Sequence, residues 1–289
     1  MTGVILIAFG RRGYGLMARN LALSLRHYAP DLPIICYAPN ELHGIIGREN
    51  ITQLLTLGKE YYTNARGKID PCKAKCHIYE LGIKAGMEKM LYLDVDALAL
   101  ADIKPMLDVL NGTPFNCEMV GKGKVGDRIN YLIWASQKDT IEQFNVKRDN
   151  PTLYATQTSW AYFERSKVAK AMQAQLKWHH IKGFPKHLLT HQWGGAIPDE
   201  LMYTGVLAKL GLDLKPLNTE RHPIFFGNKS NRKSVDAVVN GYYLLSLYGN
   251  GGSRSLTVGT WKRLYDTHVK KMGSKYLSHE LLSDKFVNA

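Results

Sequence analysis

The chain has 289 residues, of which 45% are hydrophobic and 22% charged, values that are ordinary for a soluble globular protein. This length allows a sizeable core in one large domain or in two small ones. No apolar run approaches the roughly 20 residues that span a bilayer, which excludes a transmembrane helix. The net charge of +13 is compatible with nucleic acid, an anionic surface or an acidic small substrate as partner, and also with a solvated surface that has no such partner.

The N-terminal segment is apolar but has no basic start and no small-residue cleavage site, so we expect a first strand and not a signal peptide. The cysteines are Cys36, Cys72, Cys76 and Cys117. We expect buried, reduced thiols of a cytosolic protein. A zinc site at Cys72, Cys76 and His77 is the alternative, although no fourth ligand is evident.

The first 38 residues predict a β-α-β unit. Residues 4–9 are strand-like, residues 10–15 are a glycine-rich turn, residues 16–28 have apolar positions at helical spacing, and residues 33–38 are strand-like again. Such a unit predicts parallel strands with a right-handed crossover. The glycines do not match the dinucleotide fingerprint. A phosphate can still meet this turn through Arg11 or Arg12, and the alternative is a plain turn with solvated arginines.

The rest of the chain predicts alternating helices and strands, without repeats or a linker. The predicted helices are 72–87, one capped by Asp102 that includes Leu110, 140–144, 166–178, 198–210, 260–272 and a short one near Leu281; the predicted strands are 131–135, 158–163, 213–217, 223–226 and 235–247; the predicted glycine loops are 121–128 and 248–254.

The most informative stretch is 90–100, where an apolar run of strand type leads into Asp94 and Asp96. On an extended backbone, residues two apart point to the same side, so both carboxylates can converge on one cation. The carboxyl edge of an open α/β sheet is also where ligands bind. Two hard oxygen donors suit Mg²⁺ or Mn²⁺, which complete their coordination with substrate phosphates and water.

This Leu-Asp-Val-Asp strand end resembles the Asp-x-Asp motif of GT-A-fold glycosyltransferases. The lysine-bearing segment 73–79 and the glycine loop after Leu247 are similar to parts of the glycogenin-like and related families. The resemblance implies an α/β fold of GT-A (Rossmann-like) type, with a mixed, mainly parallel sheet flanked by helices. It implies a single domain, residues 1–289, with a nucleotide-sugar-binding half at 1–110 and an acceptor-binding half with the C-terminal helices at 111–289.

The resemblance also implies metal-dependent transfer of a sugar from a nucleotide-sugar donor, expected to be a UDP-sugar, with Mn²⁺ or Mg²⁺. The metal ligands would be Asp94 and Asp96, with Asn250 or water as the third, because the late histidine and Lys-Pro-Trp of the glycogenin-like families are absent. The other residues implied for the donor are Phe9, Arg11, Arg12, Lys75 and Arg254; those for catalysis are Asp199 and Glu200; those for the acceptor are Trp160, Lys186, His191 and Trp193.

The acceptor is inferred from the charge. Basic residues interleaved with tryptophans can form a phosphate-tracking surface with stacking platforms. The basic residues are Lys122, Lys124, Arg128, Lys147, Arg148, Lys182, Lys186, Lys229, Arg232, Lys262, Arg263, Lys270 and Lys271, and the tryptophans are Trp134, Trp160, Trp178 and Trp193. We therefore predict double-stranded DNA as acceptor, as in the bacteriophage enzymes that glycosylate hydroxymethylated bases, with the base flipped out. The expected location is then the cytoplasm, that of the host if the chain is phage-encoded, without stable membrane insertion. The alternative acceptor is a bacterial surface polysaccharide or lipopolysaccharide, with a basic face toward the anionic membrane.

Two other classes of protein remain as rivals. A haloacid-dehalogenase-type phosphatase also uses Asp-x-Asp, but Leu98 stands where that family has Thr or Val. A non-enzymatic nucleic-acid-binding protein would explain the charge, but it would leave Asp94 and Asp96 without a role.

Overall fold

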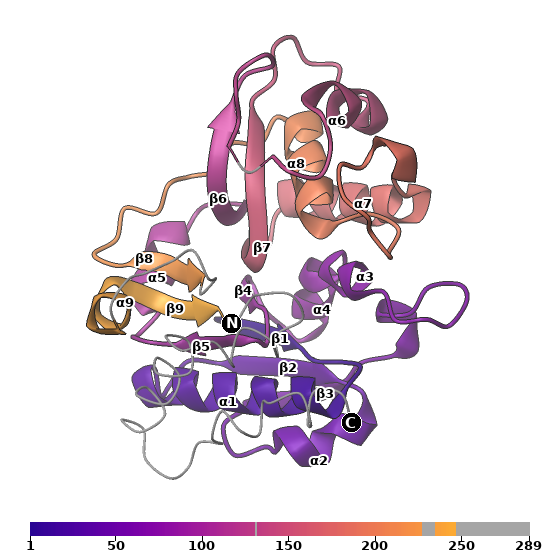
Figure 1. Ribbon diagram of the computed structural model, residues 1–289. Helices are drawn as coiled ribbons and strands as arrows, with labels where there is room; N and C mark the ends of the chain where they lie inside the picture. The colour runs from indigo at the N-terminus through magenta and orange to yellow at the C-terminus, as the bar shows by residue number, and fades with distance from the viewer. Residues whose placement is uncertain (131, 227–234, 247–289) are drawn as a thin grey trace. The chain divides into compact units, whose positions relative to one another are not determined.

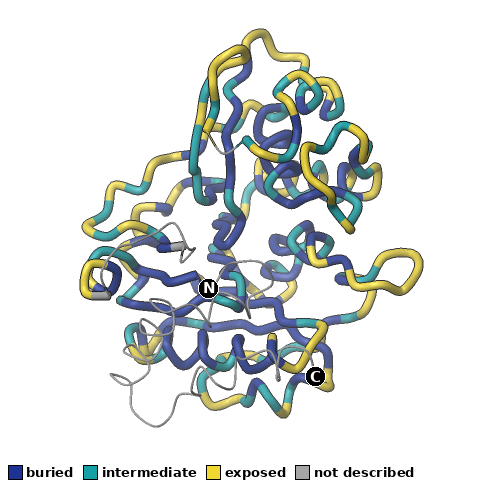
Figure 2. The backbone as a smooth tube through the Cα atoms, in the orientation of Figure 1, coloured by how far each residue is buried: buried dark blue, intermediate teal, exposed yellow. Residues whose placement is uncertain are grey.

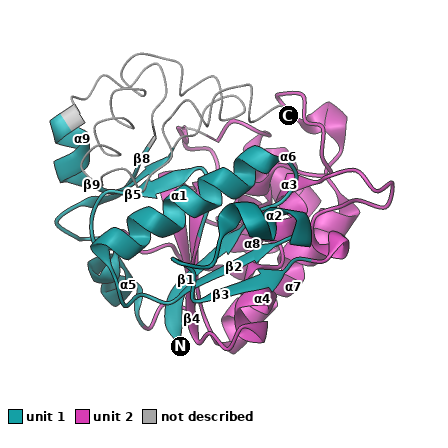
Figure 3. Cartoon of the chain, turned by 90° about the horizontal axis from the view of Figure 1, so that it is seen from below, with its two compact units in different colours: residues 1–57, 93–111, 217–289 teal, residues 58–92, 112–216 magenta. Residues whose placement is uncertain are grey.

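The computed structural model describes residues 1–130, 132–226 and 235–246. The chain divides into two compact units, coloured separately in Figure 3. Unit 1 consists of residues 1–57, 93–111 and 217–289, and unit 2 of residues 58–92 and 112–216. The predicted elements around Asn250 and Arg254, and the predicted helices beyond residue 259, lie outside the described residues. Each unit is therefore built from segments that are far apart in the sequence.

Unit 1 begins with the predicted β-α-β unit. Its described elements are β1 (Thr2–Ile7), α1 (Arg12–Tyr28), β2 (Ile34–Ala38), α2 (Asn40–Ile46), β3 (Gln53–Thr56), β5 (Ala97–Ala99), α5 (Lys104–Leu110), β8 (His222–Phe226), α9 (Val235–Gly241) and β9 (Tyr242–Ser246). β1, β2 and β3 are parallel and lie in the order β3-β2-β1, with Val4 opposite Ile34. A smaller sheet has the order β5-β9-β8.

The core of unit 1 follows from its apolar strands. Every residue of β2 is buried, and β1 is buried from Gly3 onward, as the dark blue tube in Figure 2 shows. Strands buried on both faces are typical of a parallel sheet covered by helices. In Figure 1, α1 and α2 lie together beside β1, β2 and β3. The two helices can approach closely at Gly15, where a Cβ atom would lie 3.2 Å from Ile45 Cγ2.

Unit 2 carries long antiparallel strands covered by helices. Its described elements are η1 (Lys59–Tyr61), α3 (Pro71–Lys75), α4 (Ile78–Lys84), β4 (Lys89–Leu93), β6 (Phe115–Gly123), α6 (Gln137–Phe144), β7 (Leu153–Glu164), α7 (Lys167–Lys182), η2 (Lys186–Leu188) and α8 (Asp199–Leu210). β7 lies between β4 and β6, and it is antiparallel to β6 with irregularities after Cys117 and Met119. α8 packs against β7, and both α6 and α7 pack against α8 (Figure 1). The chain is thus a mixed α/β protein with a mainly parallel central sheet flanked by helices, as predicted.

Several local predictions are confirmed. The helix predicted after Ser166 is α7, and the Ser166 hydroxyl accepts from the Ala169 N–H, as an N-cap does. The helix predicted from Pro198 is α8. The Asp102 carboxylate accepts from the N–H of Lys104, the first residue of α5, although the N-cap position itself is Ile103, which makes no side-chain cap hydrogen bond. All four cysteines are buried free thiols.

The helix predicted at 72–87 is wrong in its continuity, because it is split into α3 and α4. The N–H groups of Cys76 and His77 donate to carbonyls three residues back, so the turn tightens where an α-helix would continue. The predicted turn 10–15 is also shorter than expected, since α1 already begins at Arg12.

Three predicted strands are wrong wholly or in part. Residues 132–135 are irregular and pair only at Ala135, which bridges to Leu189. Residues 213–217 are irregular as well, and side chains hold them: Asn116 donates to the Lys215 carbonyl. The segment predicted as a strand at 235–247 begins with α9 and extends only afterwards into β9. A short apolar run does not distinguish a buried strand from a buried helix, which explains the last error.

Candidate functional site

Asp94 and Asp96 lie in the tight turn that leads from β4 into β5. The N–H of Ala97 donates to the Asp94 carbonyl at 3.2 Å and closes this turn. Both aspartates are half-buried, while Val95 between them is 7% exposed. The expectation of an extended backbone at this point was wrong, but the alternation that it predicted is present. Both aspartates are partly exposed residues of one short segment that a backbone hydrogen bond closes.

The start of α1 places further polar groups near this pair, within unit 1. The Tyr14 hydroxyl has a raised pKa because of burial, then because of the negative charge of Asp96, with a smaller effect of Asp94; Arg11 acts in the opposite direction. The effect of a charge on the pKa of another group falls with distance, so these charged groups lie close to the Tyr14 hydroxyl. The charges of Asp96, Arg11 and Asp94 all act on Tyr14, and we call these four residues the carboxylate turn site.

The loop between β1 and α1 contains a glycine in a backbone conformation with positive φ. Gly10, between β1 and α1, has a φ of +91°, which residues with a side chain rarely adopt. Arg11 is the N-cap of α1 and Arg12 its first residue, and both side chains are exposed. Phe9, the other residue predicted to contact the donor, is half-buried directly after β1. The predicted donor residues near the N-terminus therefore lie on the segment that leads into α1.

The donor set of the carboxylate turn site fits a small hard cation. Asp94 and Asp96 supply carboxylate oxygens, and Mg²⁺ and Mn²⁺ are held by few protein carboxylates plus phosphates and water. Among the described residues there is no cluster of three or more His, Cys, Asp or Glu side chains that could hold a metal ion. The predicted third ligand, Asn250, lies outside the described residues. The assignment of the metal to Asp94 and Asp96 stays a prediction.

The alternative zinc site at Cys72, Cys76 and His77 fits less well. Burial raises the pKa of both thiols well above the usual value, as expected for thiols packed among apolar groups. Cys76 Sγ donates to the Cys72 carbonyl and contacts Met202 Sδ at 3.6 Å. These thiols pack as small apolar groups within unit 2.

A second polar cluster lies inside unit 2 and joins α3, β7 and α8. Lys75 Nζ forms an ion pair with Asp199 Oδ2 at 2.7 Å, and the two side chains are only 14% and 10% exposed. The same ammonium donates to the carbonyl and hydroxyl oxygens of Thr158, both at 3.1 Å. The Thr158 hydroxyl in turn donates to Asp199. We call Lys75, Thr158, Asp199 and Glu200 the buried ion-pair cluster.

The sequence explains why these groups meet. α3 begins with Asp70, which accepts from the Cys72 N–H, and with Pro71 in its first turn, so Lys75 falls at the end of this short helix. Pro198 precedes α8 and places Asp199 and Glu200 in its first turn, where backbone N–H groups favour negative charge. The β7 strand passes between them and supplies Thr158.

The two carboxyl groups of this cluster titrate in opposite directions. Burial disfavours the charge on Asp199, but Lys75 and hydrogen bonds from Glu200 and Thr158 outweigh it and lower its pKa. Burial and the neighbouring Asp199 charge raise the pKa of Glu200 well above its usual value. The two groups titrate as a coupled pair, in which Asp199 is the stronger acid and Glu200 the weaker one.

The residues predicted for acceptor binding do not form one group. Trp160 is 1% exposed on β7, and its indole N–H donates to Glu118 Oε2 at 2.7 Å. Trp193 packs edge-on against Trp134, with ring centroids 5.4 Å apart, and His191 contacts the same Trp134 ring. The predicted role of these side chains in acceptor binding stays a prediction, and the indole of Trp160 is covered by its own unit.

The fourth acceptor prediction, Lys186, is an exposed residue of η2. Sequence reasoning did not single out the Asp70–His180 pair of unit 2, in which Oδ2 and Nε2 are 3.1 Å apart and both residues are buried. This contact joins residues 110 positions apart, which local sequence patterns do not reveal.

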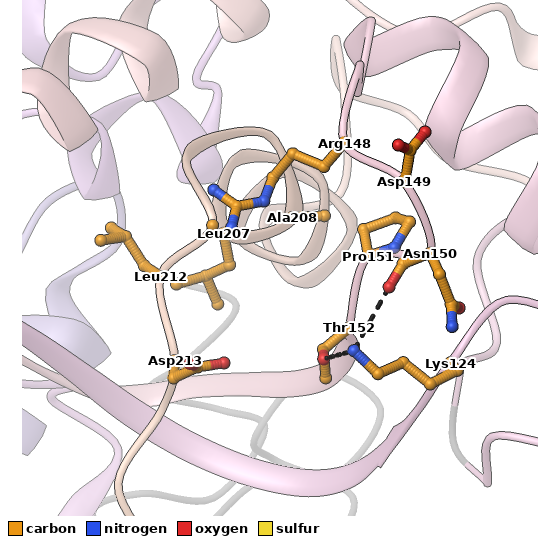
Figure 4. Close-up of a pocket in the computed structure, with 11 residues that line it drawn as sticks. Lys124, Arg148, Asp149, Asn150, Pro151, Thr152, Leu207, Ala208, Leu212 and Asp213 are labelled. Atoms are coloured by element: carbon orange, nitrogen blue, oxygen red, sulfur yellow. Dashed lines mark hydrogen bonds between the residues drawn. The ribbon is translucent and has the colours of Figure 1, made fainter.

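A cavity of about 180 Å³ opens in unit 2 between the 148–152 segment and the end of α8 (Figure 4). Lys124 Nζ donates there to Asn150 O and Thr152 Oγ1, at 3.2 and 2.8 Å. Asp149 and Asp213 also line the cavity and balance the charges of Lys124 and Arg148. Two members of the predicted phosphate-tracking surface therefore lie in a mixed-charge cavity and not on a uniformly basic face.

No helix in the described part of the chain is long and apolar enough to cross a bilayer. Lys75, predicted to contact the donor diphosphate, has its ammonium engaged by Asp199 and Thr158. That predicted role is likewise untested, as are the catalytic roles of Asp199 and Glu200.

No protein-family model and no curated protein sequence matches this chain. Its fold, however, is similar to that of solved glycosyltransferases. The bifunctional glycosyltransferase WbbM matches with a TM-score of 0.54 at 13% identity, over 92% of this chain and 51% of that one, so the present chain spans about half of its length. The galactosyltransferase LgtC, in complex with donor and acceptor sugar analogues, matches with a TM-score of 0.55 at 14% identity, over 97% of this chain and 99% of that one. An active-site mutant of LgtC matches with a TM-score of 0.50 at 15% identity, with the same coverage. The chain has the GT-A fold that the sequence predicted.

Proposed function

We propose that this protein is a glycosyltransferase that moves a sugar from a nucleotide-sugar donor to an acceptor hydroxyl, with a divalent cation at Asp94 and Asp96. The observation that carries the proposal is the carboxylate turn site: two half-buried aspartates on either side of a buried Val95, both close enough to Tyr14 of α1 for their charges to act on it. The GT-A fold supports it, because solved proteins of this fold include glycosyltransferases, although a fold alone does not specify a function.

In the proposed reaction, a bound divalent cation would stabilise the negative charge that develops on the leaving diphosphate. Asp94 and Asp96 would hold it, and the turn closed by the Ala97 N–H keeps both carboxylates in place before the donor binds. Arg11 and Arg12, at the start of α1, would contact the phosphates, as helix N-termini and arginines commonly do. Losing one pre-organised electrostatic partner typically costs ~2.7–4 kcal/mol of activation free energy.

Asp199 and Glu200 would act on the sugar or the acceptor hydroxyl. Because burial and the Asp199 charge raise its pKa, Glu200 is suited to donate a hydrogen bond, or a proton, to an oxygen of the substrate. Asp199 stays ionised against Lys75 and is nearly covered, so we assign it the role of orienting Glu200 and maintaining the negative charge beside it. Asp199 is thus a positioning residue in this proposal, and Glu200 is the group that meets the substrate.

For the acceptor, a carbohydrate has the more specific support. The solved LgtC complex contains donor and acceptor sugar analogues, which makes a saccharide acceptor, as in surface-polysaccharide or lipopolysaccharide synthesis, the first candidate to test. A hydroxymethylated base in duplex DNA, the acceptor predicted from the net charge of +13, is the second. Its support is electrostatic, since phosphate-neutralising proteins carry such charge.

The decisive experiment is a screen of nucleotide sugars for donor hydrolysis or transfer with Mn²⁺, and again after addition of EDTA. The acceptor arms are oligosaccharides, hydroxymethylated duplex DNA and unmodified duplex DNA. A phosphatase would release phosphate from phosphomonoesters and would leave the glycosidic bond of the donor intact. A nucleic-acid-binding protein would turn over no donor.

The matched variants are Asp94→Asn and Asp96→Asn, with Asp102→Asn as control, because the Asp102 carboxylate accepts from the Lys104 N–H at the start of α5. We expect each of the first two to lower donor turnover by about a hundredfold or more, while the control stays within a few-fold of the unmodified protein. Turnover retained in the double variant Asp94→Asn with Asp96→Asn would show that the metal assignment is wrong.

A further inference from the structure

Helix α7 is apolar on two opposite faces. Its inner face, which packs within unit 2, includes Ala169, Met172 and Leu176, all fully buried. On the opposite side, Ala171, Ala174, Trp178 and Ile181 are exposed, and at 3.6 residues per turn they lie within roughly 80° of the helix circumference. Trp178 is 50% and Ile181 is 83% exposed. A helix of a globular protein normally has a polar outer face, so this outer stripe requires an explanation.

Lysines border the stripe, and no acid lies on the helix. Lys167 begins the stripe, Lys170 flanks it on one side and Lys182 on the other, and all three are exposed. No Asp or Glu occurs in the sequence between Glu164 and Asp199. Lys177 is the exception on this helix, because its ammonium pairs with Glu80 at 3.1 Å. The outer face of α7 is therefore an apolar line between cations.

The tryptophan itself is surrounded by cations. Lys182 Nζ lies 5.4 Å and Lys209 Nζ 4.9 Å from the centroid of the Trp178 ring. Lys209 belongs to α8, and burial together with the positive charge of Lys182 lowers its pKa. Among the described residues no carboxylate pairs with either lysine. Lys182 donates to the Gln143 carbonyl at 2.8 Å and Lys209 contacts His179 Nε2 at 3.3 Å, but neither contact neutralises a positive charge, so an anion is favoured beside both lysines.

We propose that this outer face of α7, with Lys209 of α8, docks onto an anionic lipid bilayer. Trp178 and Ile181 would lie at headgroup level, with Ile181 reaching the acyl boundary, while Lys170, Lys182 and Lys209 contact lipid phosphates. Exposed aromatic and aliphatic side chains flanked by lysines are typical of helices that lie in the membrane interface. Long lysine side chains can keep their ammonium groups in the headgroup layer while the stripe is buried.

The same residues fit the other possible occupants less well. A nucleic-acid base would have to stack on the Trp178 ring, but two ammonium groups already lie against it, and a phosphate backbone gives Ile181 no apolar partner. A second copy of this chain on the same face would bring like charges together. The bilayer is the one partner that accommodates both the apolar stripe and its cations.

The test is sedimentation of the full chain with phosphatidylcholine vesicles that contain, or lack, phosphatidylglycerol. We expect binding only to the anionic vesicles. Ile181→Asp should weaken this binding by about tenfold or more, because the variant has no apolar side chain at this position to bury in the bilayer. Lys170→Gln and Lys182→Gln should each weaken it by about fivefold. Ile69→Asp, which changes another exposed isoleucine of unit 2, and Lys59→Gln are the matched controls and should bind as the unmodified chain does.

Equal binding of Ile181→Asp and the unmodified chain would overturn the proposal, and so would equal binding to vesicles with and without phosphatidylglycerol. A loss of binding to a duplex DNA oligonucleotide in Trp178→Ala, with vesicle binding unchanged, would assign the face to nucleic acid and refute the bilayer. A change of sedimentation coefficient from dimer to monomer in Ile181→Asp, with vesicle binding unchanged, would assign it to self-association. Nucleotide-sugar turnover in detergent-free buffer is measured alongside, so the proposed transferase activity is judged separately.

Discussion

Replacing Lys75 by methionine tests whether the buried ion-pair cluster holds unit 2 together. The substitution keeps the length and most of the volume of the side chain but removes the ammonium that Asp199 contacts at 2.7 Å and that donates twice to Thr158. Because both partners are almost fully covered, Asp199 would be left as a buried charge. Removing one partner of a buried pair in this way typically costs about 3–5 kcal/mol. We expect a loss of that size in the free energy of unfolding, measured by urea denaturation.

The chain contains a closely matched control. Lys84 pairs with Glu80 at 2.8 Å, nearly the same distance, but the Lys84 side chain is 54% exposed. Exposed pairs contribute about 0–1 kcal/mol, so Lys84→Met should change the free energy of unfolding very little. The double variant Lys75→Met with Asp199→Asn should recover part of the loss, because no unpaired charge remains. Equal effects of Lys75→Met and Lys84→Met would refute the argument that burial, and not the distance between the charges, sets the cost.

Two further substitutions test single features of unit 2. Burial raises the pKa of Glu118 to about 7, and the Trp160 indole N–H reduces this rise. Since the pKa is raised on folding, the stabilising contribution of Glu118 is present below its unfolded pKa and is lost as the pH rises through about 7. Glu118→Gln should flatten this decline, seen as urea midpoints that vary less between about pH 5 and pH 8; parallel curves for both proteins would contradict it. Gly211→Ala places a side chain at a φ of +64°, where a Cβ atom would also meet the Arg148 guanidinium. Gly211→Ala should lower the free energy of unfolding by about 1 kcal/mol. Gly44→Ala, whose Cβ atom would meet nothing within 4 Å, measures the effect of the same substitution inside a helix without a steric clash. An Arg148→Ala background that leaves the cost of Gly211→Ala unchanged would assign the whole effect to the backbone.

Much of the fold follows from local signals in the sequence. The β-α-β opening was readable because β1 and β2 are continuous apolar runs that end at glycine and proline, and α8 was readable from Pro198 and the two acids that follow it. The failures occur where tertiary contacts decide. The tight turn at Cys76 divides a helical pattern, and segment 213–217 is held by side chains of β6 and β7 and not by a neighbouring strand.

The site divides in the same way. Asp94 and Asp96 were identifiable because their spacing and the preceding apolar run are local features. Their neighbour Tyr14 was not, since its first helical turn carries no signal that it would face two aspartates. Nor was the contact of Lys75 with Thr158, two residues that are 83 positions apart. Candidate site residues can therefore be predicted from the sequence. The direction of their pKa shifts depends on neighbouring groups that only the folded structure reveals.

The opposite titration of Asp199 and Glu200 decides which of them can meet a substrate. A carboxylate whose pKa is depressed by a buried lysine is a weak base, and deprotonating an acceptor hydroxyl with it is unfavourable. Its negative charge contributes, after burial, to the raised pKa of Glu200. Adjacent acids at the start of one helix would be nearly equivalent in isolation, because both experience the same helix terminus. It is Lys75, from α3, that makes them different. If Glu200 is the group that donates to the substrate, then the residue that sets its protonation lies on another helix, and Lys75→Met should shift the pH profile of turnover even where the fold is retained.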